Sequence, residues 1–359
     1  MSIFSRSARQ QHSPRRVETG AQSVGALRRD EVAVAFELLL GRRPIHQSEI
    51  EAASRLGGLR EAVEYLLATD EFAHRYQELK KSGAQGAPSR AAASPRPAPI
   101  FLGDRVLCWT HRGQRLYVVP QDVDITPRVL LDGTWELHVE ATMLRFLRPG
   151  YTVIDCGANI GYYTIILCAA VAPHGKVHAF EAQPDLVRLL KATIYINGLG
   201  HLIDLQCCAV SDRPGSLILA QSPDHHGSGN VVPGHFIPTY DDNYPIRIEV
   251  PAVTLDAALG DRVGAVDLIH MDIEGSEPLA LRGAQALIER SPGVKIITEW
   301  SVDMMGARAD LGELVAWLKG LGFRFWVIDR ESAELTPVEA TALLGLPHGD
   351  LLLSRTDLG

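Results

Sequence analysis

Hydrophobic and polar positions follow two different patterns in the last two thirds of the chain. Short apolar runs typical of buried strands include "TVIDC" at 152–156, "KVHAF", "IDLQCCAV", "VDLIHMD", "VKIITEW", "FRFWVID" and "DLLLS". Between them, apolar residues recur every three or four positions, notably over 184–196, 275–290 and 308–320, as in amphipathic helices. Strands alternating with helices predict an α/β fold, a Rossmann-like doubly wound sheet with helices on both faces.

The first hundred residues have a different pattern. Residues 1–28 are polar and predict a disordered tail. Residues 29–80 carry helical periodicity, as in "DEVAVAFELLLG", and predict a small all-α module. Residues 81–100 are rich in Gly, Ala, Ser and Pro and predict a linker. The remaining 101–359 form the α/β domain, which begins with a predicted β-hairpin, "RVLCWT" and "RLYVV" around "HRGQ".

Composition narrows the class of protein. The net charge is -8 and the pI about 5.9, which argues against a nucleic-acid binder, because these usually have a basic domain. The five cysteines include no C-x-x-C pair, so we expect neither a zinc site nor a disulfide framework. The start of the chain lacks the apolar core of a signal peptide, and the longest apolar run, Thr164–Ala172, covers about half a membrane span. We therefore expect a cytoplasmic protein without a membrane span.

The stretch "VIDCGANIGYYT" at 153–164 predicts a ligand-binding turn after the first strand of the α/β domain. In such sheets ligands bind beyond the carboxyl ends of the strands, and glycines let a ligand approach the backbone. Here Asp155 precedes Gly157, Asn159 and Gly161, and the next strand ends at Glu181. An acid there can accept hydrogen bonds from ribose hydroxyls. The G-x-G-x-x-G spacing that holds a pyrophosphate is absent, which favours S-adenosylmethionine over a dinucleotide. A purely structural turn is the weaker alternative.

Six ordered motifs resemble the FkbM family of S-adenosylmethionine-dependent methyltransferases over about residues 105–355. They are "DGTWELHVE", "VIDCGANIGYYT", "FEAQPDLVRLLKATIYING", "AVSDRPGSLIL", "VPAVTLDAAL" and "HMDIEGSEPLALRGA". The resemblance implies the class I methyltransferase fold with a seven-stranded sheet. It also implies methylation of a hydroxyl on a small molecule, sugar or polyketide.

The same resemblance implies roles for single residues. Asp155, Gly157, Asn159 and Gly161 would line the methionine end of the cofactor, and Glu181 would hold the ribose. The third strand is followed by Ser211 and Asp212, which would sit near adenine. The family often has lysine where this chain has His270, so no role that needs a fixed positive charge is expected there, and His270 is a further candidate for substrate contact.

Three acids are candidates for the base that takes the proton of the acceptor hydroxyl. Asp272 ends the fourth strand and is the first candidate, Glu274 is the second, and Glu299, at the end of the fifth strand, is the third. Alternatively, Asp272 and Glu274 cap the helix that starts near Ser276, where the helix dipole favours acids. Glu277, inside that helix, is predicted to be structural.

Further polar and aromatic residues have weaker predictions. The loop "SPDHHGSGNVVPGH" carries His225 and His226, for which a solvated loop is the simplest interpretation, with substrate contact second and metal binding third. Cys207 and Cys208 are predicted to be core residues, and so are Trp109, Trp135 and Trp300, although each tryptophan could stack on a sugar.

The helical module gives a hint about acceptor and partner. "LLLGRRPIHQSEI … LLATDEF" resembles short modules with an L-x-G-R-x-P … S-x-E-F pattern, which accompany enzymes of bacterial surface glycans. We therefore expect a small-molecule or glycan acceptor, with a sugar preferred, and a module that docks a partner. Two other functions stay open: a catalytically silent cofactor-binding or interaction protein and, with less support, a nicotinamide dehydrogenase.

Overall fold

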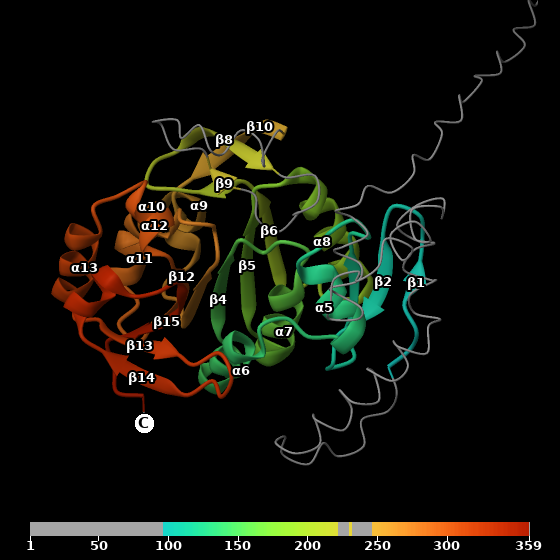
Figure 1. The fold of residues 1–359 in the computed structure, drawn as a ribbon, viewed down its shortest axis with the longest axis horizontal. Coiled ribbons are helices and arrows are strands. Elements are labelled where there is room, and N and C mark those ends of the chain that lie inside the picture. Colours follow the sequence, from blue (N-terminus) through green and yellow to red (C-terminus); the bar gives the residue numbers. More distant parts are fainter. Residues whose placement is uncertain (1–95, 222–229, 232–245, 359) are drawn as a thin grey trace, which may run out of the picture. The chain divides into compact units, whose positions relative to one another are not determined.

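The computed structural model describes residues 96–221, 230–231 and 246–358 (Figure 1). The predicted tail, the helical module and residues 81–95 of the predicted linker lie outside this range, so the division at 29, 81 and 101 stays a prediction. The first described elements are β1 (Ile100–Phe101), β2 (Val106–Trp109), β3 (Arg115–Val118), α5 (Ile125–Asp132), α6 (Leu137–Phe146), β4 (Thr152–Cys156), α7 (Tyr162–Val171), β5 (Lys176–Glu181), α8 (Pro184–Ile196), β6 (Ile203–Cys207), β7 (Ala209–Val210), β8 (Gly215–Gln221) and β9 (Asn230–Val231). The later ones are β10 (Ile246–Val253), α9 (Leu255–Leu259), the 3-10 helix η2 (Gly260–Arg262), β11 (Leu268–Met271), α10 (Glu277–Arg282), α11 (Gln285–Glu289), β12 (Lys295–Trp300), α12 (Val302–Gly306), α13 (Leu311–Gly320), β13 (Arg324–Ile328), β14 (Leu335–Val338), the 3-10 helix η3 (Ala340–Gly345) and β15 (Gly349–Ser354).

The main sheet has the strand order β14-β13-β15-β12-β11-β4-β5-β6. Parallel pairing joins β12, β11, β4, β5 and β6, whereas β15 lies antiparallel between β12 and β13. From β4 the chain runs to one edge and then returns to β11 on the other side. The switch point of this doubly wound sheet therefore lies between β4 and β11, where ligands bind in such folds.

All seven predicted strands belong to this sheet, and one further strand, β14, extends it at the β13 edge. The sequence over 335–338 contains Pro337, which cannot donate to a neighbouring strand and is tolerated at a sheet edge. Because this proline interrupts the apolar pattern, β14 was not predicted from the sequence.

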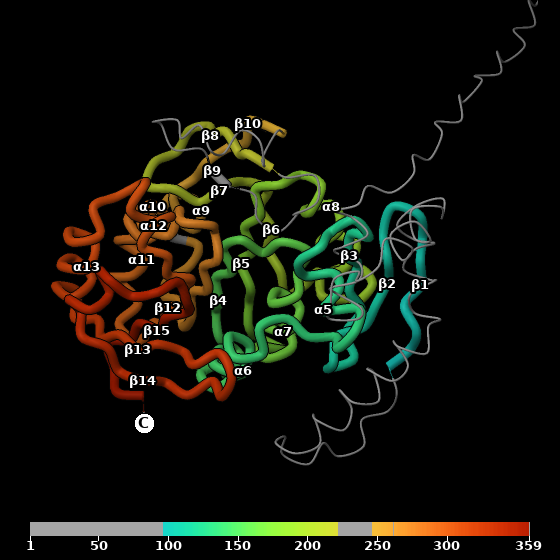
Figure 2. The backbone as a smooth tube through the Cα atoms, viewed as in Figure 1, coloured from blue at the N-terminus to red at the C-terminus, as the bar shows by residue number. Residues whose placement is uncertain are grey.

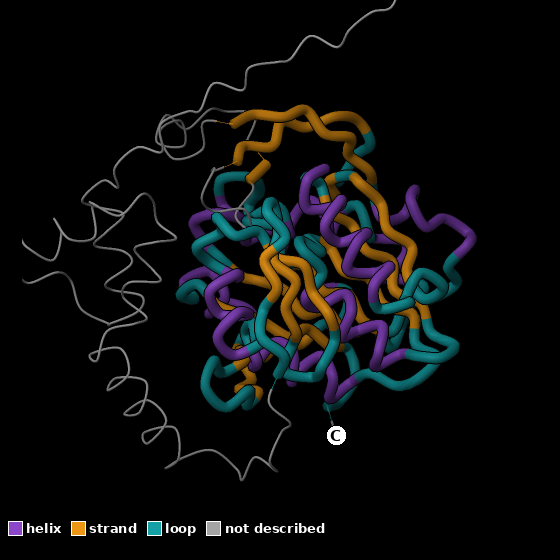
Figure 3. Tube along the Cα trace, turned by 90° about the vertical axis from the view of Figure 1, so that its right-hand side faces the viewer, coloured by secondary structure: helices purple, strands orange, loops and turns teal. Residues whose placement is uncertain are grey.

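Apolar residues on successive positions of β4 point to opposite faces, as the period of a strand requires. Val153 joins a core cluster with residues of α6, α7 and α8. Ile154 joins another with residues of α9, α10, α11 and α13. Helices therefore cover both faces of the sheet (Figure 3), as predicted.

A second, four-stranded sheet, β7-β10-β8-β9, continues from the end of β6 (Figure 2). Its strand β7 follows β6 after Cys208 alone. The predicted hairpin forms as β2 and β3 and packs on α8, where the Tyr117 N–H donates to Thr193 Oγ1 at 3.2 Å. No helix of the described residues is long and apolar enough to cross a membrane.

The helix predicted over 275–290 is interrupted. It forms as α10 and α11, with Gly283 at the break. A Cβ on Gly283 would lie 2.0 Å from the Ser211 carbonyl oxygen, so the close approach of the segment after β7 requires glycine there. The same contact helps to bury Ser211, whose position relative to the pocket is described below.

Candidate active site

The turn after β4 is fixed between two neighbouring loops. Gly157 has φ +82°, and a Cβ on it would lie 1.8 Å from the Asp272 carbonyl oxygen. The N–H groups of Gly157 and Ala158 both donate to the Phe180 carbonyl, at 2.9 and 3.0 Å. Glycine is therefore required at 157, because no side chain fits between the turn and the loop after β11.

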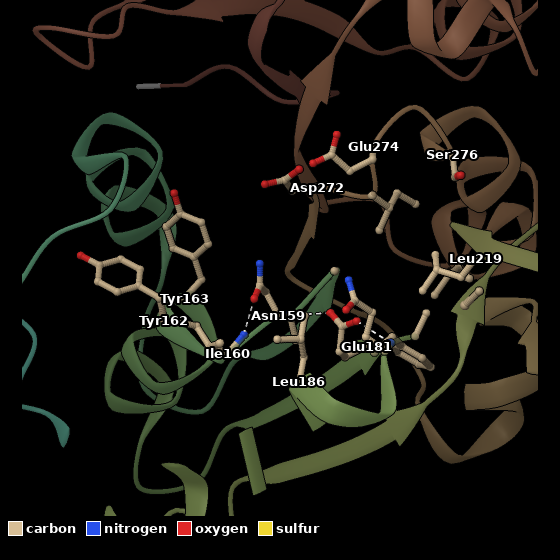
Figure 4. Close-up of a pocket in the computed structure, with 18 of the residues that line it drawn as sticks. Asn159, Ile160, Tyr162, Tyr163, Glu181, Leu186, Leu219, Asp272, Glu274 and Ser276 are labelled. Atoms are coloured by element: carbon tan, nitrogen blue, oxygen red, sulfur yellow. Dashed lines mark hydrogen bonds between the residues drawn. The ribbon is translucent and has the colours of Figure 1, made fainter. Parts of the chain in front are cut away.

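Glu181, the last residue of β5, is held by backbone donors. The Asn159 N–H donates to Glu181 Oε2 and the Gln183 N–H to Oε1, each at 2.7 Å (Figure 4). Burial raises the pKa of the Glu181 carboxyl, and these hydrogen bonds act against that shift. The carboxylate is thereby locked in one orientation in the wall of a pocket.

That pocket opens at the predicted switch point and takes its walls from several loops. Five predicted site residues line it: Gly157, Asn159, Glu181, Asp272 and Glu274. Figure 4 shows Asp272 and Glu274 on one side of the pocket, above Asn159 and Glu181. The other lining residues are Ile125, Trp135, Ala158, Ile160, Tyr162, Tyr163, Phe180, Ala182, Gln183, Leu186, Cys208, Ala209, Val210, Leu219, Ile273 and Ser276.

Asp155 and His270 lie behind the pocket and do not line it. Asp155 is fully buried, and its Oδ1 lies 2.9 Å from His270 Nδ1. Its Oδ2 accepts the Thr164 hydroxyl at 2.5 Å. Both oxygens of Asp155 thus face neighbouring side chains, and the expected ligand contacts of Asp155 and His270 stay predictions. The pair joins β4 to β11 beneath the turn.

Four more predicted residues are absent from the lining. Gly161 faces Leu190, whose Cδ1 would lie 2.3 Å from a Cβ there. Ser211 is 3% exposed and packs on Gly283, and its hydroxyl donates to Asp212 Oδ1 at 3.2 Å. Their expected places at the methionine end and near adenine stay predictions. Glu299, the fourth, lies near Asp272 without reaching the pocket surface.

The acids beside the pocket repel one another. Burial, followed by the charges of Glu299 and Glu274, raises the pKa of Asp272 well above its usual range. Burial and Glu277 raise the pKa of Glu274 to about 7. Burial and Glu274 raise that of Glu299 to about 9. At neutral pH this group of acids therefore retains protons, and Glu274 is the member whose pKa lies near neutrality.

Asp272 and Glu274 are not the side chains that hold the start of α10. That helix begins at Glu277 without a side-chain cap. Instead, Glu277 Oε1 accepts the Ile273 N–H at 2.9 Å, which confirms the structural assignment of Glu277. The carboxylates of Asp272 and Glu274 face the pocket.

Backbone strain gathers around the pocket. Four described residues other than glycine have positive φ, a region that is costly for residues with a side chain. Three of them are Glu136, Asn159 and Glu274, with φ of 32°, 51° and 55°. Glu136 accepts the Tyr163 hydroxyl at 3.1 Å. Such strain persists where the surrounding structure enforces a functional geometry.

Sequence reasoning missed the aromatic residues and one serine of the lining. Tyr162 and Tyr163 follow Gly161 directly in "GYYT", and that position alone could have indicated them. Trp135 and Cys208 were assigned to the core and line the pocket. Ser276 was considered only as the place where a helix starts.

The histidines of the 222–229 loop, His225 and His226, lie outside the described residues, so their three interpretations stay predictions. Within the described ranges no group of three or more His, Cys, Asp or Glu side chains is arranged to hold a metal ion.

Comparison with known proteins agrees with this geometry. Residues 155–325 match the profile of the methyltransferase FkbM domain. The matched region is an FkbM-type methyltransferase domain. The chain is 29% identical over 200 residues to the 31-O-demethyl-FK506 methyltransferase FkbM of Streptomyces tacrolimicus, covering 49% of this chain and 74% of that protein. It is 32% identical over 90 residues to a protein-L-isoaspartate O-methyltransferase of Aeropyrum pernix, covering 24% of this chain and 33% of that protein.

Solved structures match more distantly. The methyltransferase FkbM of Methylobacillus flagellatus KT aligns with a TM-score of 0.36 and 17% identity, over 57% of this chain and 43% of that one. A SAM-dependent methyltransferase from Aquifex aeolicus aligns with a TM-score of 0.35 and 15% identity, over 63% of this chain and 91% of that one. This chain thus spans less than half of the Methylobacillus protein.

Proposed function

We propose that this methyltransferase transfers a methyl group from S-adenosylmethionine to a hydroxyl of a small molecule or glycan, with a sugar as the preferred acceptor. The observation that carries the proposal is the meeting of three groups in one pocket: the Asn159 turn, the Glu181 carboxylate and the Asp272 carboxylate. The first two suit the cofactor, and the third suits the acceptor.

The cofactor wall fits an adenosyl group bearing an amino acid. Both Glu181 oxygens already accept one backbone N–H, and each keeps a lone pair for a ribose hydroxyl. The turn over 157–161 brings backbone rather than side chains to the ligand, which suits the methionine end. Bound there, S-adenosylmethionine supplies a methyl group on a positively charged sulfur.

Asp272 is our proposed base. The acceptor oxygen must reach the methyl carbon opposite the sulfur, at about 3 Å, so positioning supplies much of the rate. With the cofactor bound, the methyl group would pass to the acceptor oxygen, with S-adenosylhomocysteine as the leaving group. The hydroxyl proton passes to the Asp272 carboxylate, whose raised pKa makes it a stronger base than an exposed aspartate. The negative charges of Glu299 and Glu274 help to raise the pKa of Asp272.

The acceptor class rests on three supports. The Streptomyces relative carries the name of an O-methyltransferase for a small molecule. Trp135, Tyr162 and Tyr163 give the pocket an aromatic side, which suits the flat apolar face of a sugar ring. The helical module over 29–80 resembles those of glycan enzymes, and we propose that it docks a partner of the cytoplasmic enzyme.

Calorimetry of the full chain tests the cofactor first. We expect micromolar binding of S-adenosylmethionine and S-adenosylhomocysteine and none of NAD. A screen of methyl glycosides, nucleotide sugars and polyketide alcohols then tests the acceptor, with S-adenosylhomocysteine formation as the readout. NAD binding alone would replace the proposal with a dehydrogenase. Cofactor binding without turnover on any acceptor class would favour a silent binding protein.

A further inference from the structure

Glu136 has a left-handed backbone conformation directly before helix α6. Its φ and ψ are 32° and 65°, a region that glycine occupies freely and that is costly for a residue with a side chain. The side chain does not cap the helix, since it makes no capping hydrogen bond. Glu136 also precedes residues 155–325, the region that matches the methyltransferase domain. The reason for a glutamate here must therefore lie in its other side-chain contacts.

The Glu136 carboxylate accepts a hydrogen bond from Tyr163, a residue of the pocket lining. The Tyr163 hydroxyl donates to Glu136 Oε2 at 3.1 Å, whereas the Glu136 carbonyl oxygen lies 3.5 Å from the same hydroxyl, too far for a strong bond. The ring of Tyr163 meets the ring of His270 edge to face, with centroids 4.8 Å apart. Tyr163 is thus held at its hydroxyl by Glu136 and at its ring by His270.

Tyr163 and Asp272 both line the pocket, and their side chains interact. In the view of Figure 4, the Asp272 carboxylate lies between Tyr163 and Glu274. Burial, and then the charges of Glu136 and Asp272, raise the pKa of the Tyr163 hydroxyl well above its usual range. A phenolic hydroxyl has one proton to donate. While Glu136 accepts that proton, the Asp272 carboxylate keeps its lone pairs for an acceptor hydroxyl.

We infer that Glu136 is a positioning residue, which holds the Tyr163 hydroxyl away from Asp272 and thereby keeps the base open to the acceptor. The inference rests on the proposed function, in which Asp272 takes the acceptor proton. Without the Glu136 carboxylate, the buried hydroxyl of Tyr163 lacks its acceptor, and a hydrogen bond to Asp272 would satisfy it. Such a bond would make Asp272 a weaker base and would occupy the oxygen that the acceptor needs. The strained backbone at Glu136 thus serves a functional geometry.

Sinefungin tests the inference without an acceptor. This analogue of S-adenosylmethionine has an amine in the position of the transferred methyl group, so its charged amine should meet the Asp272 carboxylate. S-adenosylhomocysteine has no group there. Calorimetry on the full chain would measure the Kd of both ligands. In Glu136→Ala we expect sinefungin to bind about 10-fold more weakly, the scale of a hydrogen bond to a charged group, and S-adenosylhomocysteine to change by less than about 2-fold.

A second substitution separates positioning from a loss of structure. In Glu136→Ala combined with Tyr163→Phe, the hydroxyl that competes for Asp272 is gone, so sinefungin affinity should return to within about 3-fold of the wild type. A merely structural role of Glu136 predicts the opposite, because the second substitution removes a further polar group. Turnover of an acceptor from the screen should follow the same order, with a loss of at least ~10-fold in Glu136→Ala and recovery in the double variant.

Three further variants serve as controls. Glu136→Gln keeps an oxygen that accepts the Tyr163 hydroxyl and should stay within about 3-fold of the wild type for both ligands. Glu136→Gly guards against a folding defect, because glycine adopts the left-handed backbone freely, and it should show the same loss as Glu136→Ala. Glu249 also accepts one hydroxyl, that of Ser216, and lies outside the pocket lining, so Glu249→Ala should change neither Kd.

The outcomes are distinct. An unchanged sinefungin Kd in both Glu136→Ala and Glu136→Gly overturns the inference, as does a double variant that binds sinefungin as weakly as Glu136→Ala. An equal loss for S-adenosylhomocysteine would mean that Glu136 acts on the cofactor turn and overturns it too. If Asp272→Asn leaves sinefungin binding unchanged, or if the wild-type chain binds neither ligand, the proposed function fails first and the inference falls with it.

Discussion

Glu181 and Glu299 each lie at or near the end of a parallel strand of one sheet, yet their surroundings differ. Glu181, at the end of β5, accepts a backbone N–H on each oxygen. Glu299 lies next to the last residue of β12, and its Oε1 is 3.2 Å from His348 Nε2 while its Oε2 is buried without a hydrogen-bond partner. Backbone donors fix the first carboxylate, whereas neighbouring acids crowd the second.

This difference illustrates two ways in which the polar groups of a binding site can be arranged before the ligand arrives. On the Glu181 side, polar groups are satisfied before a ligand arrives, so little reorganises on binding. On the Asp272 and Glu299 side, repulsion between acids is relieved by a proton. We infer that the first side holds the cofactor in place and that the second side handles the proton of the acceptor. The predictions below change one side at a time.

The largest effect is expected from Asp272→Asn. An asparagine keeps the shape and cannot take the acceptor proton, so turnover should fall by at least ~100-fold. The Kd for S-adenosylhomocysteine should stay within about 3-fold. Wild-type turnover should rise with pH through the raised pKa of Asp272, because the base acts in its deprotonated form. Turnover is measured with an acceptor from the screen, and affinity by calorimetry.

Glu274→Gln is the matched variant on the same side of the pocket. Its turnover should stay within ~10-fold of the wild type. Loss of a general base lowers turnover by at least ~100-fold, and Glu274 is not the proposed base. Near-normal turnover of Asp272→Asn together with a large loss in Glu274→Gln would transfer the role of base to Glu274. Near-normal turnover of both would leave the two acids with a shaping role only.

The next effect is a loss of cofactor affinity in Glu181→Ala. Removing a charged partner of the ribose hydroxyls should weaken S-adenosylhomocysteine binding by ~10- to 100-fold, since such hydrogen bonds contribute about 1.5–3 kcal/mol. Calorimetry of the variant measures this directly. The 2′-deoxy form of the ligand should lose less affinity on mutation than the parent, and an equal loss for both would mean that Glu181 acts through the turn alone.

The sequence was sufficient for seven strands of the main sheet, for the turn and for the acids on both sides of the pocket, but not for β14 or for β8, β9 and β10 of the second sheet. Strand period and the glycine spacing are local signals, and they placed Gly157, Asn159, Glu181, Asp272 and Glu274 correctly in the pocket. The sequence did not reveal the buried contacts of Asp155 and Ser211, because a motif does not tell which way a side chain points. Asp155 turns inward to His270, a residue 115 positions away.

The smallest effect concerns stability and tests the acceptor side without a ligand. The pKa of Glu299 is raised to about 9, so the folded chain keeps a proton that the unfolded chain loses near its ordinary value of 4.5. Unfolding between these values releases a proton, and wild-type stability therefore falls as pH rises from about 5 to 9. Glu299→Gln cannot ionise, and it should raise the melting temperature by a few °C at pH 8 and by less at pH 5.

Glu331→Gln, at an exposed glutamate, is the control and should follow the wild type at every pH. A gap between Glu299→Gln and wild type that widens with pH would support the view that this side of the site holds its acids under repulsion. A gap that stays constant would mean that Glu299 is ionised in the folded chain and paired with His348. The Glu299 carboxylate would then be paired before any ligand binds, as the Glu181 carboxylate is. The contrast between the two sides of the pocket would disappear.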